Sequence, residues 1–209
     1  MIVDKRKAML HWYCTSWANI MIRPLCWVGL LGVKVKGREH LPPGAGVIVA
    51  NHQSQLDILI AFLTWAEFKW VSKASIFKIP MIGWGMAVSG YIGLKRGDSA
   101  SVKQMMKDCL KAMEKGSRVA LFPEGTRSQD GKLQSFKPGP FVIASKGKVP
   151  VIPLVIRGTA AALPKHGWRF RWGSKMELEF LPAISAEEVK ELGSKGVMAK
   201  CEAMIRDAL

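Results

Sequence analysis

The sequence predicts an α/β fold: a single domain in which helices flank a mixed, mostly parallel β-sheet. From residue 33 onward, short β-branched runs alternate with amphipathic stretches, as strands and helices do in α/β proteins. The chain has 209 residues, which is enough for one compact domain with a substantial core and too few for two ordinary ones. We therefore look for one active site.

Composition indicates an anionic partner. Lys and Arg number 31 against 16 Asp and Glu, which gives a net charge of +15. Nucleic acid and the anionic face of a bilayer both fit this charge, but eight Trp, eight Phe and eleven Met favour a lipid surface. A soluble protein whose charge serves only solubility is the alternative. Hydrophobic residues at 49% and charged residues at 22% exclude a disordered chain and a polytopic membrane protein.

The N-terminal region differs from the rest, and we expect residues 1–32 to form a membrane-associating helical segment ahead of the domain at 33–209. Two uncharged runs, 8–22 and 25–33, flank Arg23-Pro24. At about 1.5 Å per residue the first run reaches only about 22 Å, short of the roughly 30 Å hydrocarbon core. We expect two short helices lying in the bilayer interface, or, alternatively, packed on the core. The aromatic residues expected at headgroup depth are Trp12, Tyr13, Trp17 and Trp27.

The elements of the domain follow in order. The clearest helix spans 99–115, with an apolar stripe opposite a ridge of lysines that is typical of a solvated face, and Gly116 stands where a C-cap belongs. A last helix begins near Ser185, which forms a capping box with Glu188, and a break is expected at 193–196. The predicted strands are 33–35, 47–50, 68–71, 91–94, 118–122, 151–156 and 176–180.

His52 is the candidate general base. It comes just after a predicted apolar strand and just before a predicted helix, at the edge of the sheet where sites form. Within one continuous helix, His52 and Asp57 would lie about 140° apart around the axis. With His52 in the strand-to-helix bend and Asp57 in the first helical turn, the carboxylate can fix one ring nitrogen and leave the other free to take a proton. No serine nucleophile elbow, phosphate-binding loop or H-E-x-x-H motif is present, so the pair would act directly on a substrate hydroxyl.

A second group of candidate site residues leaves the strand at 118–122. Glu124, Gly125, Thr126 and Arg127 follow it together, and such a turn can offer backbone N–H groups and a guanidinium to a phosphate. A plain polar loop is the alternative. Two further strand candidates are followed by Lys73 and Arg96, each of which alone would be read as an ordinary surface charge. Four strand ends followed by such groups predict one site.

The cysteines predict neither a metal site nor a disulfide framework. They are widely scattered, with no C-x-x-C pair and no histidine at ligand spacing. The four positions are Cys14, Cys26, Cys109 and Cys201. We therefore expect free thiols without a catalytic role, no bound metal and no carboxylate cluster.

Two motifs resemble those of the glycerolipid acyltransferase family, and of its bacterial lysophosphatidic acid acyltransferases in particular. Asn51-His52-x-x-x-x-Asp57 looks like H-x-x-x-x-D, and 122–128 looks like F-P-E-G-T-R-S. Segments 73–80 with Gly83, 90–97 and 149–154 resemble the other blocks of that family. The resemblance covers 33 to about 160 in order, and Lys95 stands where many members have an acidic residue.

The resemblance implies a function in phospholipid biosynthesis. His52, with Asp57, would deprotonate the free sn-2 hydroxyl of 1-acyl-sn-glycerol-3-phosphate for attack on an acyl thioester, forming phosphatidic acid. Lys73, Arg96 and Arg127 would bind the acceptor phosphate, and Glu124 and Gly125 would shape the acceptor pocket with Thr126. The co-substrate would be acyl-acyl carrier protein or acyl-coenzyme A, with no cofactor. The thioester oxyanion would bind N–H groups either after His52 or in the Gly125 turn.

The expected partners are a membrane lipid acceptor, the carrier thioester and an anionic membrane surface. The protein would be monotopic on the inner, cytoplasmic membrane, with its catalytic domain facing the cytoplasm. One rival is a related enzyme with another lysolipid acceptor. A basic nucleic-acid-binding module is a rival of another class, and its best support is 168–172, where aromatic and basic residues alternate. That alternation equally suits a strand with one basic face, and we expect no nucleic acid.

Overall fold

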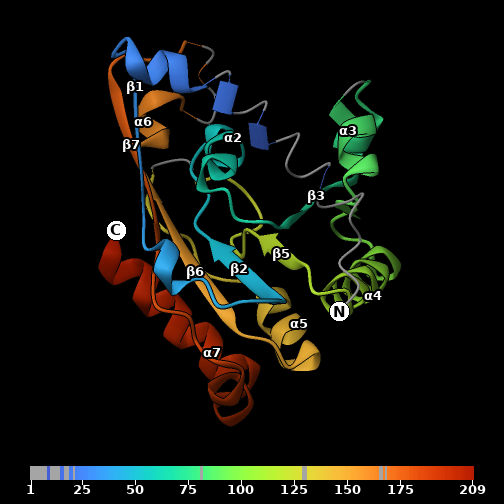
Figure 1. The fold of residues 1–209 in the computed structure, drawn as a ribbon. Coiled ribbons are helices and arrows are strands. Elements are labelled where there is room, and N and C mark those ends of the chain that lie inside the picture. The colour runs from blue at the N-terminus through green and yellow to red at the C-terminus, as the bar shows by residue number, and fades with distance from the viewer. Residues whose placement is uncertain are drawn as a thin grey trace.

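The computed structural model describes residues 9, 15–16, 19–20, 22–80, 82–128, 131–164, 167 and 169–209. Seven strands of the described chain form one sheet in the order β1-β7-β6-β2-β5-β3-β4 (Figure 1). Neighbours pair in parallel except β6 and β7, which are antiparallel. The predicted single α/β domain with a mixed, mostly parallel sheet is confirmed. The strands are β1 (Leu31–Lys36), β2 (Gly46–Ala50), β3 (Lys69–Lys73), β4 (Ile92–Leu94), β5 (Arg118–Leu121), β6 (Val151–Arg157) and β7 (Ser174–Phe180).

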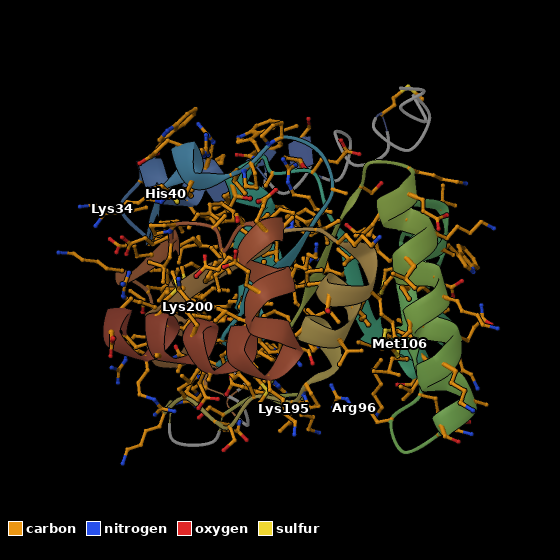
Figure 2. All side chains as sticks on the ribbon, turned by 90° about the horizontal axis from the view of Figure 1, so that it is seen from below. Lys34, His40, Arg96, Met106, Lys195 and Lys200 are labelled. Carbon is orange, nitrogen blue, oxygen red and sulfur yellow. The ribbon has the colours of Figure 1, made fainter. Side chains whose placement is uncertain are left out.

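Helices cover both faces of this sheet. On one face α4, α5 and α7 lie side by side, and α2 and α6 lie on the other (Figures 1 and 2). The α-helices are α2 (Leu56–Ala61), α3 (Ile82–Val88), α4 (Ser99–Glu114), α5 (Gly139–Gly147), α6 (Thr159–Ala162) and α7 (Ala186–Ala208). Short 3-10 helices are η1 (Arg38–His40), η2 (Phe62–Thr64) and η3 (Ala74–Lys78). All seven predicted strands are present, with ends that shift by one or two residues.

The alternation of side chains along the central strands divides the core into two clusters. Val47 and Val49 of β2 belong to the cluster under α4, α5 and α7. Ile48, between them, points to the opposite face and belongs to the cluster under α2. Every residue of β2 is buried, because the strand is covered on both sides and paired on both edges. The segment that follows β2 therefore starts from a rigid base.

Helix α4 confirms its prediction. Asp98 caps it by accepting a hydrogen bond from the Ser101 N–H at 3.1 Å, and Gly116 follows it with φ +79°. Met106 points toward α5 in Figure 2 and packs on the core. The ridge of lysines opposite is exposed, as expected: Lys103, Lys107, Lys111 and Lys115.

Helix α7 begins after Ser185, whose hydroxyl accepts from the Glu188 N–H at 3.2 Å. The Glu188 carboxylate pairs with Lys200. Gly193 interrupts the helix with φ 62° and ψ 174°, so the predicted break is confirmed. The strand considered for 168–172 is wrong. Residues 169–172 include a bend and a turn and no strand, and Phe170 and Trp172 meet edge to face at 5.0 Å.

The described part of the N-terminal region packs partly on the core. Residues 22–27 are helical, and Ile22, Leu25 and Cys26 contact the cluster under α2. Trp27 remains 80% exposed. The second apolar run does not continue as a helix to residue 33, because β1 already starts at Leu31. Trp12, Tyr13 and Trp17 lie outside the described residues. Within the described ranges, no helix is long and apolar enough to cross a membrane.

Candidate active site

The sheet order brings the four predicted strand ends together. Strands β2, β5, β3 and β4 are consecutive and parallel, so their carboxyl ends share one edge of the sheet. His52 follows β2, Lys73 ends β3, Arg96 follows β4 and the 122–128 turn follows β5. The carboxyl edge of a parallel sheet is where binding sites form in such folds. Sequence separations of tens of residues become neighbouring positions along this edge.

His52 and Asp57 form the expected pair. The chain turns after β2, and α2 begins at Leu56, which places Asp57 in the first helical turn. His52 Nδ1 lies 2.8 Å from Asp57 Oδ2, while the histidine side chain is 13% exposed and the aspartate 0%. Since a carboxylate accepts, the hydrogen bond puts the proton on Nδ1 and leaves Nε2 able to take another. The bend at the end of β2 lets the side chains of His52 and Asp57 face each other, which one continuous helix would not allow.

Asp57 also holds the turn that carries His52. The same Oδ2 accepts hydrogen bonds from the backbone N–H groups of Gln53 at 2.7 Å and Ser54 at 2.9 Å. Its other oxygen, Oδ1, is buried without a hydrogen-bond partner among the described residues. Three donors converging on one oxygen fix the carboxylate, so the aspartate orients both the imidazole and its backbone.

Asn51 anchors the same turn to β6. Its amide Nδ2 donates to the Ile156 carbonyl at 2.8 Å, and its Oδ1 accepts from the Ile156 N–H at 2.8 Å. The side chain thus replaces one rung of the β2–β6 ladder just beyond the end of β2. Because Asn51 is buried, both hydrogen bonds are shielded from water. No local pattern predicts this role, since Ile156 is remote from Asn51 in the chain.

Glu124 supports the backbone of His52. Its Oε1 accepts from the His52 N–H at 2.6 Å, and its Oε2 accepts from the Gln134 N–H at 3.0 Å. Burial raises the pKa of the Glu124 carboxyl, and these N–H groups oppose that rise. The family resemblance implied a place for Glu124 in the acceptor pocket. The contacts that the structure shows for it are to the catalytic turn, and its contact with the acceptor remains a prediction.

The His52 ring stacks on an aromatic column. Its centroid lies 3.9 Å from that of Phe122, with 13° between the planes, and Phe122 stacks in turn on buried Trp70 at 4.8 Å. The far side of Trp70 meets Phe68 edge to face at 5.2 Å. The column restricts rotation of the imidazole, and an aromatic face also favours the imidazolium form that proton transfer creates.

The turn after β5 closes over His52. The Ser128 N–H donates to the His52 carbonyl at 2.9 Å, which ties the two segments together. Gly125 has φ +74°, and a Cβ there would lie 2.9 Å from the Lys137 ammonium nitrogen. The positive φ favours glycine at this position, and the end of the Lys137 side chain lies against it. Lys137 is a cation of this turn that sequence reasoning missed.

The cations at the other end of the edge are less constrained. The side chains of Lys73 and Arg96 are exposed and make no hydrogen bond or ion pair with described residues. Arg96 lies at the margin of the molecule, near the first turn of α4 (Figure 2). Lys95, its neighbour, pairs with Asp98 at 3.4 Å instead. The structure therefore favours Arg96 over Lys95 as the cation available to a ligand.

The site has the chemistry of a proton acceptor. Across the described residues no group of His, Cys, Asp and Glu side chains could hold a metal ion. His52 can take a proton at Nε2, and Asp57 can stabilise the resulting imidazolium. The fold and the site thus place a hydrogen-bonded His–Asp pair, the arrangement of a general base, at the carboxyl edge of a parallel sheet.

Comparison with known proteins then gives the family. The acyltransferase family model matches residues 32–157, a stretch that contains both His52 and Asp57 and the 122–128 turn. The chain belongs to the acyltransferase family.

The relatives support the same assignment. The chloroplastic 1-acyl-sn-glycerol-3-phosphate acyltransferase of Arabidopsis thaliana is 41% identical over 161 residues, covering 76% of this chain and 44% of its own. The enzyme of that name from Pseudomonas aeruginosa is 26% identical and covers 87% and 70%. The crystal structure of PlsC, the 1-acyl-sn-glycerophosphate acyltransferase of Thermotoga maritima, superposes with a TM-score of 0.78 at 25% identity, covering 98% of this chain and 80% of that one. The match spans less than half the length of the relatives from Arabidopsis thaliana, Brassica napus and Chlamydomonas reinhardtii.

Proposed function

We propose that the protein transfers a fatty acyl chain from a thioester to the free sn-2 hydroxyl of 1-acyl-sn-glycerol-3-phosphate, forming phosphatidic acid. The observation that carries the proposal is the 2.8 Å hydrogen bond between His52 Nδ1 and Asp57 Oδ2, which leaves Nε2 free for the hydroxyl proton. The names of relatives that share 37% and 41% identity with this chain support the choice of acceptor.

The reaction needs one base and no covalent enzyme intermediate. His52 Nε2 takes the hydroxyl proton as the oxygen attacks the thioester carbonyl carbon, which forms a tetrahedral oxyanion. The C–S bond then breaks, the carbonyl re-forms, and the thiolate leaves and takes the proton back from His52. Asp57 stays ionised and stabilises the imidazolium between the two steps. The base accounts for about 10²- to 10⁴-fold of the rate, and positioning and oxyanion stabilisation for the rest.

The contacts of the catalytic turn narrow the choice of oxyanion donors. The N–H groups of Gln53 and Ser54 are used by Asp57, and that of Leu56 donates to Ser54 Oγ at 3.3 Å. In the turn after β5, the Gly125 N–H likewise donates to the Phe122 carbonyl at 3.1 Å. The candidate oxyanion donors are therefore the N–H group of Gln55, just before α2, and that of Thr126, after β5. Lys73, Arg96 and Arg127 are the proposed ligands of the acceptor phosphate, because guanidinium and ammonium groups pair well with phosphate oxygens.

The activity test uses both donor classes and several acceptors. Purified protein is given 1-oleoyl-sn-glycerol-3-phosphate with oleoyl-acyl carrier protein or with oleoyl-coenzyme A, and phosphatidic acid is measured by mass spectrometry. We expect product with at least one donor and none from the His52→Ala variant. Glycerol-3-phosphate and lysophosphatidylcholine are the competing acceptors. Faster acylation of either one would overturn the choice of acceptor while keeping the acyl transfer.

We also infer that the protein is monotopic on the cytoplasmic membrane, with its catalytic edge open to the cytoplasm. Support comes from the exposed apolar residues of the N-terminal region, Ile20, Trp27 and Val28. Trp27→Gln with Val28→Gln is expected to shift protein from the membrane to the soluble fraction. Leu192→Gln, an exposed apolar residue of α7, is the matched control. Labelling of introduced cysteines in sealed vesicles tests the sidedness, and a label on the far side would contradict the monotopic arrangement.

A further inference from the structure

A cavity of about 420 Å³ lies between the N-terminal helical residues and β1, away from the catalytic turn. The helical residues contribute Arg23, Cys26 and Trp27 to its wall. The rest of the wall is Val33 and Val35 of β1, Arg38 of η1 and Leu63 of η2. The N-terminal ribbon lies beside the top of β1 in Figure 1. A volume of this size holds a phosphate group together with part of an attached apolar molecule.

Two guanidinium groups give the cavity its charge. Arg38 donates to the Leu63 carbonyl at 2.9 Å, which fixes it at the base of the wall. Arg23 donates through Nε to the Asn19 amide oxygen at 2.7 Å. Neither arginine has a carboxylate partner in the described part of the chain. Each therefore keeps N–H groups and a full positive charge for an anion, and guanidinium binds phosphate in a bidentate manner.

The surroundings point to a lipid rather than a free anion. Besides the two arginines, the wall carries the apolar side chains of Val33, Val35 and Leu63. Next to the cavity, Trp27 is 80% and Val28 69% exposed, which forms an apolar rim. A free phosphate has no apolar part that could bury these surfaces. A phospholipid can place its phosphate on the arginines and its chains along the rim.

The cavity is separate from the acceptor site. Strands β7 and β6 lie between β1 and β2 in the sheet, so three strand spacings, about 14 Å, separate β1 from the strand that leads to His52. Neither the catalytic pair nor the cations of the catalytic edge line the cavity. A ligand here therefore need not be the acyl acceptor.

We propose that this cavity binds the phosphate of an anionic phospholipid and so holds the N-terminal region at the bilayer surface. The arginines bind the headgroup, and the rim formed by Trp27 and Val28 enters the acyl-chain region. The site is selective for a phosphate attached to a lipid and does not depend on the identity of the acyl acceptor.

The first experiment measures binding to vesicles that contain no substrate or product. Phosphatidylcholine vesicles with and without phosphatidylglycerol are sedimented with the full chain. The variant is Arg23→Gln with Arg38→Gln. The control, Lys111→Gln with Lys195→Gln, removes the same charge from exposed positions on α4 and α7. Lys195 lies well away from Lys34 of β1 and His40 of η1 in Figure 2.

We expect the arginine variant to lose at least about 10-fold in affinity for phosphatidylglycerol vesicles, since each charge-assisted hydrogen bond is worth roughly a factor of ten or more. The lysine control should lose only a few-fold. Equal losses of affinity in the two variants would overturn the proposal. They would show that binding comes from diffuse attraction between a basic protein and an anionic surface. Thermal unfolding of each variant shows that it is folded. Arg38→Lys, which keeps the charge but not the bidentate geometry, should bind with intermediate affinity.

The second experiment uses Cys26 as a reporter inside the cavity, in a Cys14→Ser background. Cys109 and Cys201 are buried, and burial raises the pKa of both thiols to about 12, so they alkylate slowly. Dihexanoyl phosphatidylglycerol below its micelle threshold should slow alkylation of Cys26 in the parent and not in the arginine variant. Dihexanoyl phosphatidylcholine and inorganic phosphate at matched ionic strength should protect less. Equal protection by inorganic phosphate would contradict a lipid site, and no protection by any of them would contradict an anion site.

Discussion

The two ends of the catalytic edge are built differently. After β2 and β5, each group that positions the base is buried and hydrogen-bonded: Asn51, Asp57 and Glu124 all make contacts of 3.0 Å or less. After β3 and β4, Lys73 and Arg96 are exposed and their side chains contact no described hydrogen-bond partner. A general base must be oriented before the substrate arrives, because a misplaced imidazole transfers no proton. A side chain that binds a phosphate can instead become ordered when the phosphate binds. The comparison predicts that substitutions after β2 and β5 lower the turnover number. Substitutions after β3 and β4 should instead weaken substrate binding.

The largest effect is expected from Asp57. In Asp57→Asn, the amide oxygen can keep the hydrogen bonds from His52, Gln53 and Ser54, but the charge that stabilises the imidazolium is lost. We expect the turnover number to fall about 10²- to 10⁴-fold with the fold retained. Steady-state kinetics and circular dichroism measure the two quantities.

Asp57→Ala is the companion variant. It leaves three donors without their acceptor and should also lower the free energy of unfolding by a few kcal/mol, at about 1–3 kcal/mol per buried group. Equal stability of Asp57→Ala and the parent would show that the carboxylate does not hold the turn.

Asn51→Ala tests whether the hydrogen bonds to β6 hold the turn that carries His52. The substitution leaves the N–H and carbonyl of Ile156 unpaired in a buried place, and we expect a loss of about 2–5 kcal/mol in the free energy of unfolding, with a lower turnover number. Urea denaturation measures the first. Gln53→Ala is the control, because the Gln53 side chain makes one hydrogen bond, at 3.0 Å, to the Gly131 carbonyl of a loop, and its backbone N–H is kept in the variant. A loss no greater than that of the control would argue against the anchoring role.

Arg96→Ala tests the role of the exposed cations after β3 and β4. If Arg96 binds the acceptor phosphate, the Michaelis constant for the acceptor should rise about 10- to 150-fold, which corresponds to about 1.5–3 kcal/mol, with little change for the donor. Lys95→Ala is the matched control because its ammonium already pairs with Asp98. A rise for the donor alone would move Arg96 to the phosphates of the carrier.

Glu124→Gln should give the smallest effect, seen in the pH dependence of stability. Burial raises the pKa of this carboxyl above its usual 4.5 in the folded protein. Between 4.5 and the folded value, the folded state therefore binds more protons than the unfolded state, and stability falls as the pH rises. Glu124→Gln should remove that slope in denaturation curves measured on both sides of 4.5. The amide has one acceptor oxygen for two N–H groups, so a modest loss of activity is also expected. An unchanged slope would mean that another group produces it.

Local patterns predicted most of the fold and the catalytic pair. Strand runs, the stripe of α4 and the break at Gly193 are signals carried by neighbouring residues, and His52 and Asp57 are five positions apart. Contacts between remote segments gave no such signal. Glu124 reaches the His52 N–H only because β2 and β5 are adjacent in the sheet, and Asn51 reaches Ile156 only because β2 and β6 are.

The wrong strand at 168–172 has a physical explanation. Alternation of aromatic and basic residues suits a strand, but it cannot show whether a partner strand is available. β7 begins only at Ser174 and occupies the place beside β1 and β6. The preceding residues turn instead, and Phe170 and Trp172 pack on each other. Alternation alone was therefore not enough to predict pairing.

The pairing of β1 with β7 also has a consequence for how the chain folds. Leu31 pairs with Ser174, so β1 can pair only after β7, the last strand of the described sheet, has been synthesised. Contacts of such long sequence separation slow folding, and an unpaired strand is prone to join other chains in the meantime. The basic, aromatic-rich N-terminal region emerges before the catalytic core is complete. If that region binds a bilayer as proposed above, the contact would hold β1 at the surface during synthesis until β7 is available to pair with it.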